Sequence, residues 1–97
     1  MTNVKATLKG KNGKEFEALV PITTAAMAMY CGAYDKNGAH ISRIGYSVVR
    51  EIHDFCISNA TETEEINQAN YFMELLTPVM EREERMTCPG GVELYRD

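Results

Sequence analysis

The sequence VKATLKGKNGKEFEALV, residues 4–20, alternates apolar and polar side chains on both sides of an Asn-Gly pair. Alternation with a period of two indicates β-strands, and Asn-Gly between two such runs indicates a hairpin turn. A two-residue turn would place Leu8 opposite Glu17 and mix the two faces. A three-residue loop over 11–13, with its glycine in the left-handed conformation, pairs Leu8 with Phe16 and keeps the apolar residues on one face. We therefore predict a β-hairpin closed by the three-residue loop.

A short apolar segment follows the hairpin. Pro21 ends the second predicted strand, and residues 24–31 are apolar or small. Thr23 or Thr24 provides the side-chain oxygen that caps a helix N-terminus. We predict a short, largely buried helix over 24–31. Over 34–40, where a second Lys-Asn-Gly occurs, we predict a loop or a short strand pair.

The clearest helical periodicity lies in residues 41–59. One face of a helix with 3.6 residues per turn collects the apolar residues Ile44, Val48, Val49, Ile52, Phe55 and Cys56. We predict a helix here with Ser42 as its N-cap. A second stripe leaves Tyr46 and Ile57 facing outward, which could seed an interface and makes a homodimer possible. The alternative is that this stripe packs under the loop at 33–40.

A second long helix is predicted over residues 62–86. Residues 61–64, TETE, have the Thr-x-x-Glu pattern of a capping box. Pro78 should break a helix, yet it falls on the solvent-facing side of this helix, away from its apolar residues. We predict a kinked but continuous helix. A separate second helix, with Thr77 as N-cap and Pro78 in its first position, is the alternative.

Residues 92–96 alternate again and are predicted to form a last strand that joins the hairpin. The predicted fold class is α+β: a small antiparallel sheet, made of the N-terminal β-hairpin plus the C-terminal strand, packed on one face against about three helices. The 97 residues, 44% of them apolar, are expected to form a single domain over 1–97.

The charge is distributed unevenly along the chain. Residues 1–49 carry six basic and three acidic side chains, whereas residues 50–97 carry four basic and eleven acidic ones, so +3 and −7 sum to the net −4. No uncharged stretch is long enough to cross a membrane, and no basic segment followed by an apolar one opens the chain. Three cysteines without close pairing indicate a reducing compartment. We therefore predict a cytoplasmic protein without membrane contact.

Few residues have the spacing of a catalytic or metal site. His53 and Cys56 lie three apart on a predicted helix, and Cys31, Cys88 and His40 could complete a zinc site. The same His-Cys pair could activate a thiol nucleophile. Because paired short-range ligand spacings are missing, we predict no metal and no cofactor. No phosphate-binding loop, GxSxG or HExxH motif occurs, so we predict a non-enzymatic protein.

Two surfaces are candidate binding sites. The hairpin tip carries Lys9, Lys11 and Lys14, which could contact an acidic partner or a phosphate backbone. The C-terminal half carries acidic side chains, exposed amides and the outward stripe. The residues predicted to bind a partner are Glu62, Glu64, Glu65, Asn67, Asn70, Glu74, Glu81, Glu83, Glu84, Tyr46 and Ile57.

These observations favour a protein-interaction module over an enzyme. The leading hypothesis is a module that docks its acidic helices on a basic surface of a larger protein or complex. One concrete version is a small phage or mobile-element inhibitor of a nucleic-acid-processing or defence complex. The alternatives are a nucleic-acid-binding accessory protein that uses the hairpin tip, or a small metal or thiol protein. We do not expect direct nucleic-acid binding, because too few basic residues share a helical face.

Overall fold

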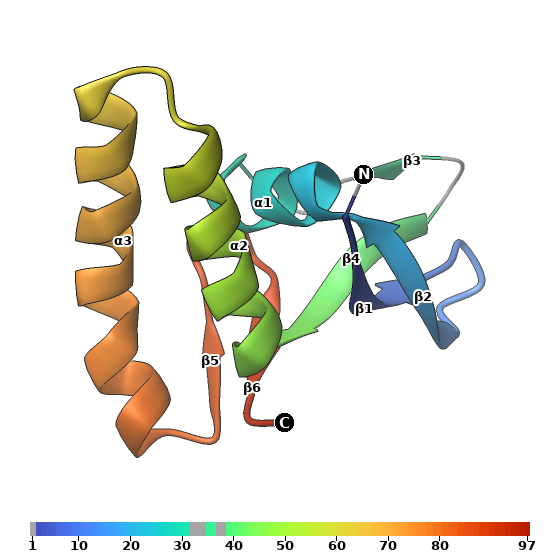
Figure 1. Cartoon of the computed structure of the whole chain (residues 1–97). Helices are drawn as coiled ribbons and strands as arrows, with labels where there is room; N and C mark the ends of the chain where they lie inside the picture. Colours follow the sequence, from blue (N-terminus) through green and yellow to red (C-terminus); the bar gives the residue numbers. More distant parts are fainter. Residues whose placement is uncertain (1, 32–34, 37–38) are drawn as a thin grey trace.

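The computed structural model describes residues 2–31, 35–36 and 39–97. Within these residues the chain forms six strands and three helices (Figure 1). In chain order the elements are β1 (Asn3–Lys9), β2 (Glu15–Pro21), α1 (Ile22–Cys31), β3 (Asp35–Lys36), β4 (Ala39–Gly45), α2 (Tyr46–Asn59), α3 (Thr63–Arg82), β5 (Arg85–Thr87) and β6 (Glu93–Tyr95). The predicted α+β class is confirmed.

The predicted hairpin is confirmed in its register and its turn. Strands β1 and β2 are antiparallel, and Leu8 lies opposite Phe16. The backbone N–H of Gly10 donates to the carbonyl of Lys14 at 3.0 Å and brackets a three-residue loop. Gly13 closes this loop with a φ of 79°, a left-handed conformation that glycine adopts without steric cost.

The sheet is mixed, with the strand order β2-β1-β4-β6-β5 and with β3 paired to β4. The prediction of an antiparallel sheet in which the last strand joins the hairpin is therefore wrong. Strand β4 lies beside β1, and β6 pairs parallel to β4 and antiparallel to β5. A parallel pair requires a long crossover connection. Helices α2 and α3 together with β5 provide it.

The predicted helix over 42–59 is wrong in its first turn. Residues 41–45 belong to strand β4, and α2 begins at Tyr46. The Ser42 hydroxyl donates to the carbonyl of Thr7 at 3.2 Å across the sheet, so Ser42 caps no helix. Ile41 and Ile44 are buried in the hydrophobic core. Pairing with β1 and β6 overrides the local periodicity, which fits a helix equally well.

The outward-facing stripe predicted for α2 does not exist. Only 7% of Tyr46 is exposed, and its hydroxyl donates to the carbonyl of Glu83 at 3.0 Å. Ile57 is half-buried. Tyr46 therefore belongs to the core, where a buried tyrosine hydroxyl needs a hydrogen-bond partner. This removes Tyr46 from the outward stripe, and the possible homodimer stays a prediction.

Helix α1 begins at Ile22, two residues earlier than predicted, so Thr23 and Thr24 lie inside its first turn rather than at its cap. The Ile22 N–H donates to the carbonyl of Thr2 at 3.0 Å. The strand pair anticipated for 34–40 exists as β3 against the start of β4. Residues 37–38 of the second Lys-Asn-Gly lie outside the described residues.

Helix α3 runs through Pro78 without a break, which confirms the continuous helix and excludes a separate one starting at Thr77. The helix ends at Arg82 rather than near 86, because β5 pairs with β6 there. The predicted capping box is also wrong. Glu62 occupies the N-cap position without a side-chain hydrogen bond, and the Thr61 hydroxyl instead donates to Oε1 of Glu65 at 3.4 Å.

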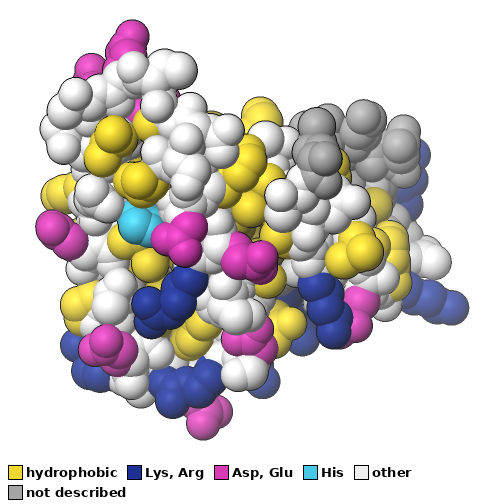
Figure 2. All heavy atoms as spheres, viewed as in Figure 1, with side chains coloured by type: hydrophobic (Ala, Val, Ile, Leu, Met, Phe, Trp, Pro, Cys, Tyr) yellow, Lys and Arg dark blue, Asp and Glu magenta, His cyan; other side chains and the backbone are white. Residues whose placement is uncertain are grey.

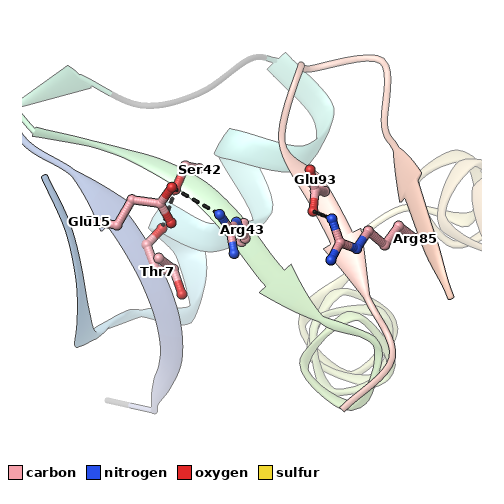
Figure 3. Close-up of polar contacts among 6 residues, drawn as sticks. All are labelled: Thr7, Glu15, Ser42, Arg43, Arg85 and Glu93. Carbon is pink, nitrogen blue, oxygen red and sulfur yellow. Dashed lines mark hydrogen bonds and ion pairs between the residues drawn. The ribbon is translucent and has the colours of Figure 1, made fainter. Parts of the chain in front are cut away.

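The helices cover one face of the sheet. Helix α1 packs on β1 and β2, α2 packs on β4, and α3 contacts β5, while α2 also contacts both other helices. The largest fully buried side chains between these layers are Ile22, Met29, Ile41, Ile44, Ile52, Leu94, Val49 and Val92. The opposite face is solvated and carries the ion pairs Arg43–Glu15 and Arg85–Glu93, with closest N···O distances of 2.9 and 3.9 Å (Figure 3).

The N-terminus of α2 is capped from the other end of the chain. Gly45 occupies the N-cap position and has no side chain to cap with. The backbone N–H of Ser47 donates to Oδ1 of Asp97 at 3.2 Å, and the Ser47 hydroxyl bonds the same carboxylate. These bonds satisfy one of the free N–H groups at the helix start and place a negative charge at the positive end of the helix dipole.

Replacing Asp97 by asparagine is expected to lower the free energy of unfolding by about 0.5 kcal/mol at neutral pH, because the amide oxygen still accepts a hydrogen bond but the negative charge at the helix N-terminus is lost. The hydrogen bonds from Ser47 hold the pKa of Asp97 below its ordinary value. The stabilisation is therefore present above the ordinary carboxyl pKa and is lost as the pH falls through the lowered pKa of the folded state. Urea unfolding of the wild type and the variant at several pH values measures how this stabilisation depends on pH. A wild-type-to-variant difference that persists in acid would contradict it, and Glu51→Gln on the exposed side of α2 is the control.

Candidate protein-docking groove

An open groove lies between the N-terminal half of α3 and the C-terminal ends of α1 and α2. Its volume is about 720 Å³. The residues that line it are Tyr30, Cys56, Asn59, Glu64, Glu65, Asn67, Gln68, Ala69, Tyr71, Phe72 and Leu75. We call this surface the α3 groove. Its apolar side chains come from three different helices, so the tertiary fold and not any single helix creates it.

The α3 groove has an aromatic floor and an apolar ridge. The rings of Tyr30 and Phe72 pack with centroids 4.5 Å apart and planes tilted by 59°, a favourable aromatic geometry. On α3, Tyr71 and Leu75 are one turn apart and expose 61% and 57% of their surface. Two large apolar residues this exposed on neighbouring turns form a patch of the kind that marks interaction sites.

The polar groups in the floor are neutral. Burial raises the pKa of Tyr30 to about 12, and the neighbouring Cys56 adds to this shift. Burial likewise raises the pKa of the Cys56 thiol above its ordinary value. At neutral pH both groups keep their protons, so Cys56 lacks the thiolate character that a nucleophile needs.

The histidine and cysteines considered for chemistry are not assembled into a site. Nε2 of His53 lies 2.9 Å from Oδ1 of Asn70, so the ring bridges α2 to α3 instead of facing Cys56. Cys31 is exposed, whereas the buried Cys88 donates its S–H to the carbonyl of Val92 at 3.2 Å. Among the described residues, no three His, Cys, Asp or Glu side chains come together as metal ligands.

Acidic side chains without basic neighbours surround one end of the α3 groove. Glu62, Glu64 and Glu65 are exposed at the start of α3, and none of them takes part in an ion pair among the described residues. Residues 51–81 contain seven Asp or Glu and no Lys or Arg. Figure 2 shows acidic side chains at the end where Figure 1 places the N-terminus of α3, and basic ones toward its other end. The helix dipole favours acids at this terminus.

The structure separates the predicted binding residues into groups. Glu64, Glu65 and Asn67 line the α3 groove. Asn70 and Glu74 lie on the other flank of α3, in the seam that contains His53. The remaining acids lie at the far end of α3, close to Arg82, Arg85 and Arg96. They are Glu81, Glu83 and Glu84.

Sequence reasoning missed most of the apolar part of the groove. Tyr30 lies in the predicted buried helix over 24–31 and Phe72 in the long helix predicted over 62–86, and nothing in the sequence distinguishes a groove lining from ordinary packing at either position. Leu75 is the residue that could have indicated the groove from the sequence, because it lies outside the apolar face of α3 and one turn after Tyr71. An apolar pair with helical spacing on a polar face indicates a contact surface.

The basic hairpin tip lies on the opposite side of the molecule from α3 (Figure 1). Lys9, Lys11 and Lys14 are exposed, and within the described part of the chain no acidic side chain pairs with them. Glu15, the cross-strand neighbour of Lys9, pairs instead with Arg43. The tip and the α3 groove are thus two separate surfaces of opposite charge.

No family model, no curated protein and no solved structure matches the chain. Within the described ranges, no helix has both the length and the apolar character required to span a membrane.

Proposed function

We propose that the protein is a non-enzymatic interaction module that docks the α3 groove on a basic surface of a larger protein. The observation that carries the proposal is the exposed pair Tyr71 and Leu75 beside acidic side chains that have no ion-pair partner in the described part of the chain. Apolar anchors supply affinity when a partner excludes water from them, and the surrounding charges steer and orient the encounter.

The partner class follows from the charge of this surface. Basic protein surfaces are common where nucleic acid is bound, so we propose a nucleic-acid-processing or defence complex as the target and a phage or mobile-element inhibitor as the role. A net charge of −4 is too small for mimicry of an entire nucleic acid. The acidic contact is therefore confined to one end of α3. Three free cysteines support a reducing, cytoplasmic setting for this encounter.

The test compares two charge reversals of equal size. The partner is first isolated with the tagged wild-type chain from the source cell, and its Kd is then measured with purified components. Reversing Glu62, Glu64 and Glu65 to lysine is expected to weaken binding by about tenfold, ~1.4 kcal/mol. Reversing Glu81, Glu83 and Glu84, which the sequence also placed among the binding residues, changes the net charge equally. These three lie outside the groove, so under this proposal the Kd is expected to stay within about twofold.

Two outcomes would overturn the proposal. Equal losses from both reversals would indicate attraction by overall charge without a defined site. A loss confined to a variant with Lys9, Lys11 and Lys14 changed to glutamate would favour the nucleic-acid-binding accessory protein, whose affinity would also fall steeply with salt.

A further inference from the structure

We infer that the α3 groove accepts an amphipathic helix that carries lysine or arginine beside its apolar stripe. This inference rests on the proposed function and specifies what the partner inserts. It follows from three properties of the groove: the elements that line it, its size and the placement of its charges.

The lining elements exclude an extended peptide as the occupant. All groove residues belong to helices α1, α2 and α3, so the described lining contains no strand with a row of unpaired N–H and C=O groups. At the end of α2, Nδ2 of Asn59 donates to the carbonyl of Phe55 at 2.9 Å, and the N–H of Ala60 donates to the carbonyl of Ile57. No strand edge is therefore available, and a peptide entering this apolar surface must satisfy its own backbone. A helix does so.

The size of the groove fits a few side chains of such a helix. A volume of about 720 Å³ lies in the range of ordinary ligand clefts. The Tyr71–Leu75 ridge extends over one helical turn, about 6 Å along the axis. Apolar residues at i, i+3 or i+4 and i+7 of a bound helix would pack between this ridge and the Tyr30–Phe72 floor.

The charges specify basic flanks. Glu64 and Glu65 lie on the rim, Glu62 lies next to them, and the amides of Asn59, Asn67 and Gln68 add further acceptors and donors. Because residues 51–81 contain no Lys or Arg, an acidic helix would meet only like charges. A basic amphipathic helix is complementary to both the apolar and the charged part of the groove.

The experiment uses the full chain and two synthetic helical peptides of about 15 residues, near the shortest length that forms a helix in water. Both carry leucine at i, i+3, i+4 and i+7. One has lysine on the flanks, and the matched peptide has glutamate there. Amide chemical shifts of the isotope-labelled protein locate and quantify binding. We expect the lysine peptide to perturb α3 over 64–75 together with Tyr30, and the glutamate peptide to bind at least about tenfold more weakly.

Variants then assign the contact to the groove. Changing Tyr71 and Leu75 to serine removes exposed side chains and leaves the core intact, and we expect it to weaken peptide binding about tenfold or more. Leu19→Ser is the matched control, because Leu19 is also an exposed leucine, 70% accessible, on the opposite face of the sheet. Its Kd should equal that of the wild type.

The inference is overturned if the lysine peptide binds elsewhere, does not bind, or binds no better than a proline-containing peptide of the same composition. Failure of the proposed function would look different. If the lysine peptide fails but the Glu62, Glu64 and Glu65 reversal still weakens the natural partner, the docking surface stands and only its helical occupant is wrong. If the peptide binds in the groove while that reversal leaves the natural partner unaffected, the proposed function is wrong and the helix-accepting groove stands.

Discussion

Replacing Leu94 by alanine is expected to lower the free energy of unfolding by about 3 kcal/mol, within the usual cost of emptying a buried leucine site. Leu94 is completely buried in β6, between Ile44 of β4 and Met86 of β5. A domain of this size has a total stability of about 5–15 kcal/mol, so this one change removes a large part of it. Urea unfolding followed by far-ultraviolet circular dichroism measures the loss.

The matched control is Leu19→Ala on β2. Leu19 exposes 70% of its surface on the helix-free side of the sheet, and its truncation is expected to change stability by no more than about 0.5 kcal/mol. Equal effects of the two substitutions would contradict the placement of β6 in the middle of the core. The pair thus tests whether β6 lies in the core of the domain.

The hairpin was predictable because its information is local. The alternation in residues 4–20 and the position of Gly13 determine both the turn and the register, and no distant segment is needed to choose between the two loops. Helix α3 was predictable for the same reason. Its apolar face is continuous, and Pro78 lies on the exposed side.

Strands β4, β5 and β6 depend on distant partners, and their arrangement was not predictable. Residues 41–45 fit the periodicity of the following helix, and only their pairing with β1 and β6 makes them a strand. Residues 85–87 continue the phase of α3 in the same way until β6 pairs with them. The apolar face predicted for α2 does face the core, and Tyr46 is buried in addition because it is the first residue of the helix, directly after β4, where its hydroxyl bonds the Glu83 carbonyl.

The candidate site was predictable in its charge and not in its shape. The acidic start of α3 is visible in the sequence as a run of glutamates after Asn59. The groove beside it needs Tyr30 of α1 and Cys56 of α2 to come to the same place, which only the packing of three helices determines. Charge patterns report what a surface attracts, and tertiary packing decides whether that surface can also hold an apolar anchor.

Replacing Arg96 by alanine is expected to lower the free energy of unfolding by about 2 kcal/mol, the typical effect of losing hydrogen bonds from a charged donor. Nη2 of Arg96 lies 3.1, 3.3 and 3.2 Å from the carbonyl oxygens of Met80, Glu81 and Glu83. The last carbonyls of a helix lack partners within the helix, and a positive charge there also complements the helix dipole. Arg96 therefore caps the C-terminus of α3.

Two further variants separate the cap from a general loss of charge. Arg82→Ala removes an exposed arginine of the last helical turn that makes no hydrogen bond among the described side chains, and it is expected to change stability by no more than about 0.5 kcal/mol. Arg96→Lys keeps the charge but loses the planar fork, so an intermediate loss is expected. If Arg96→Ala and Arg82→Ala have equal effects on urea unfolding, the capping role is contradicted.

The same substitution tests whether stability and docking are separable in this fold. Arg96 contacts the end of α3 that lies away from the groove. There the Tyr46 hydroxyl and the Arg96 guanidinium both donate to the Glu83 carbonyl. Arg96→Ala should therefore speed amide hydrogen exchange in the last turn of α3 and show coupling to Tyr46→Phe in a double-mutant cycle.

Binding of the lysine peptide to Arg96→Ala should remain within about twofold of the wild type, since the groove is formed by the other half of the helix. A large loss of peptide affinity in Arg96→Ala would mean that the C-terminal cap holds the whole of α3 in its binding position.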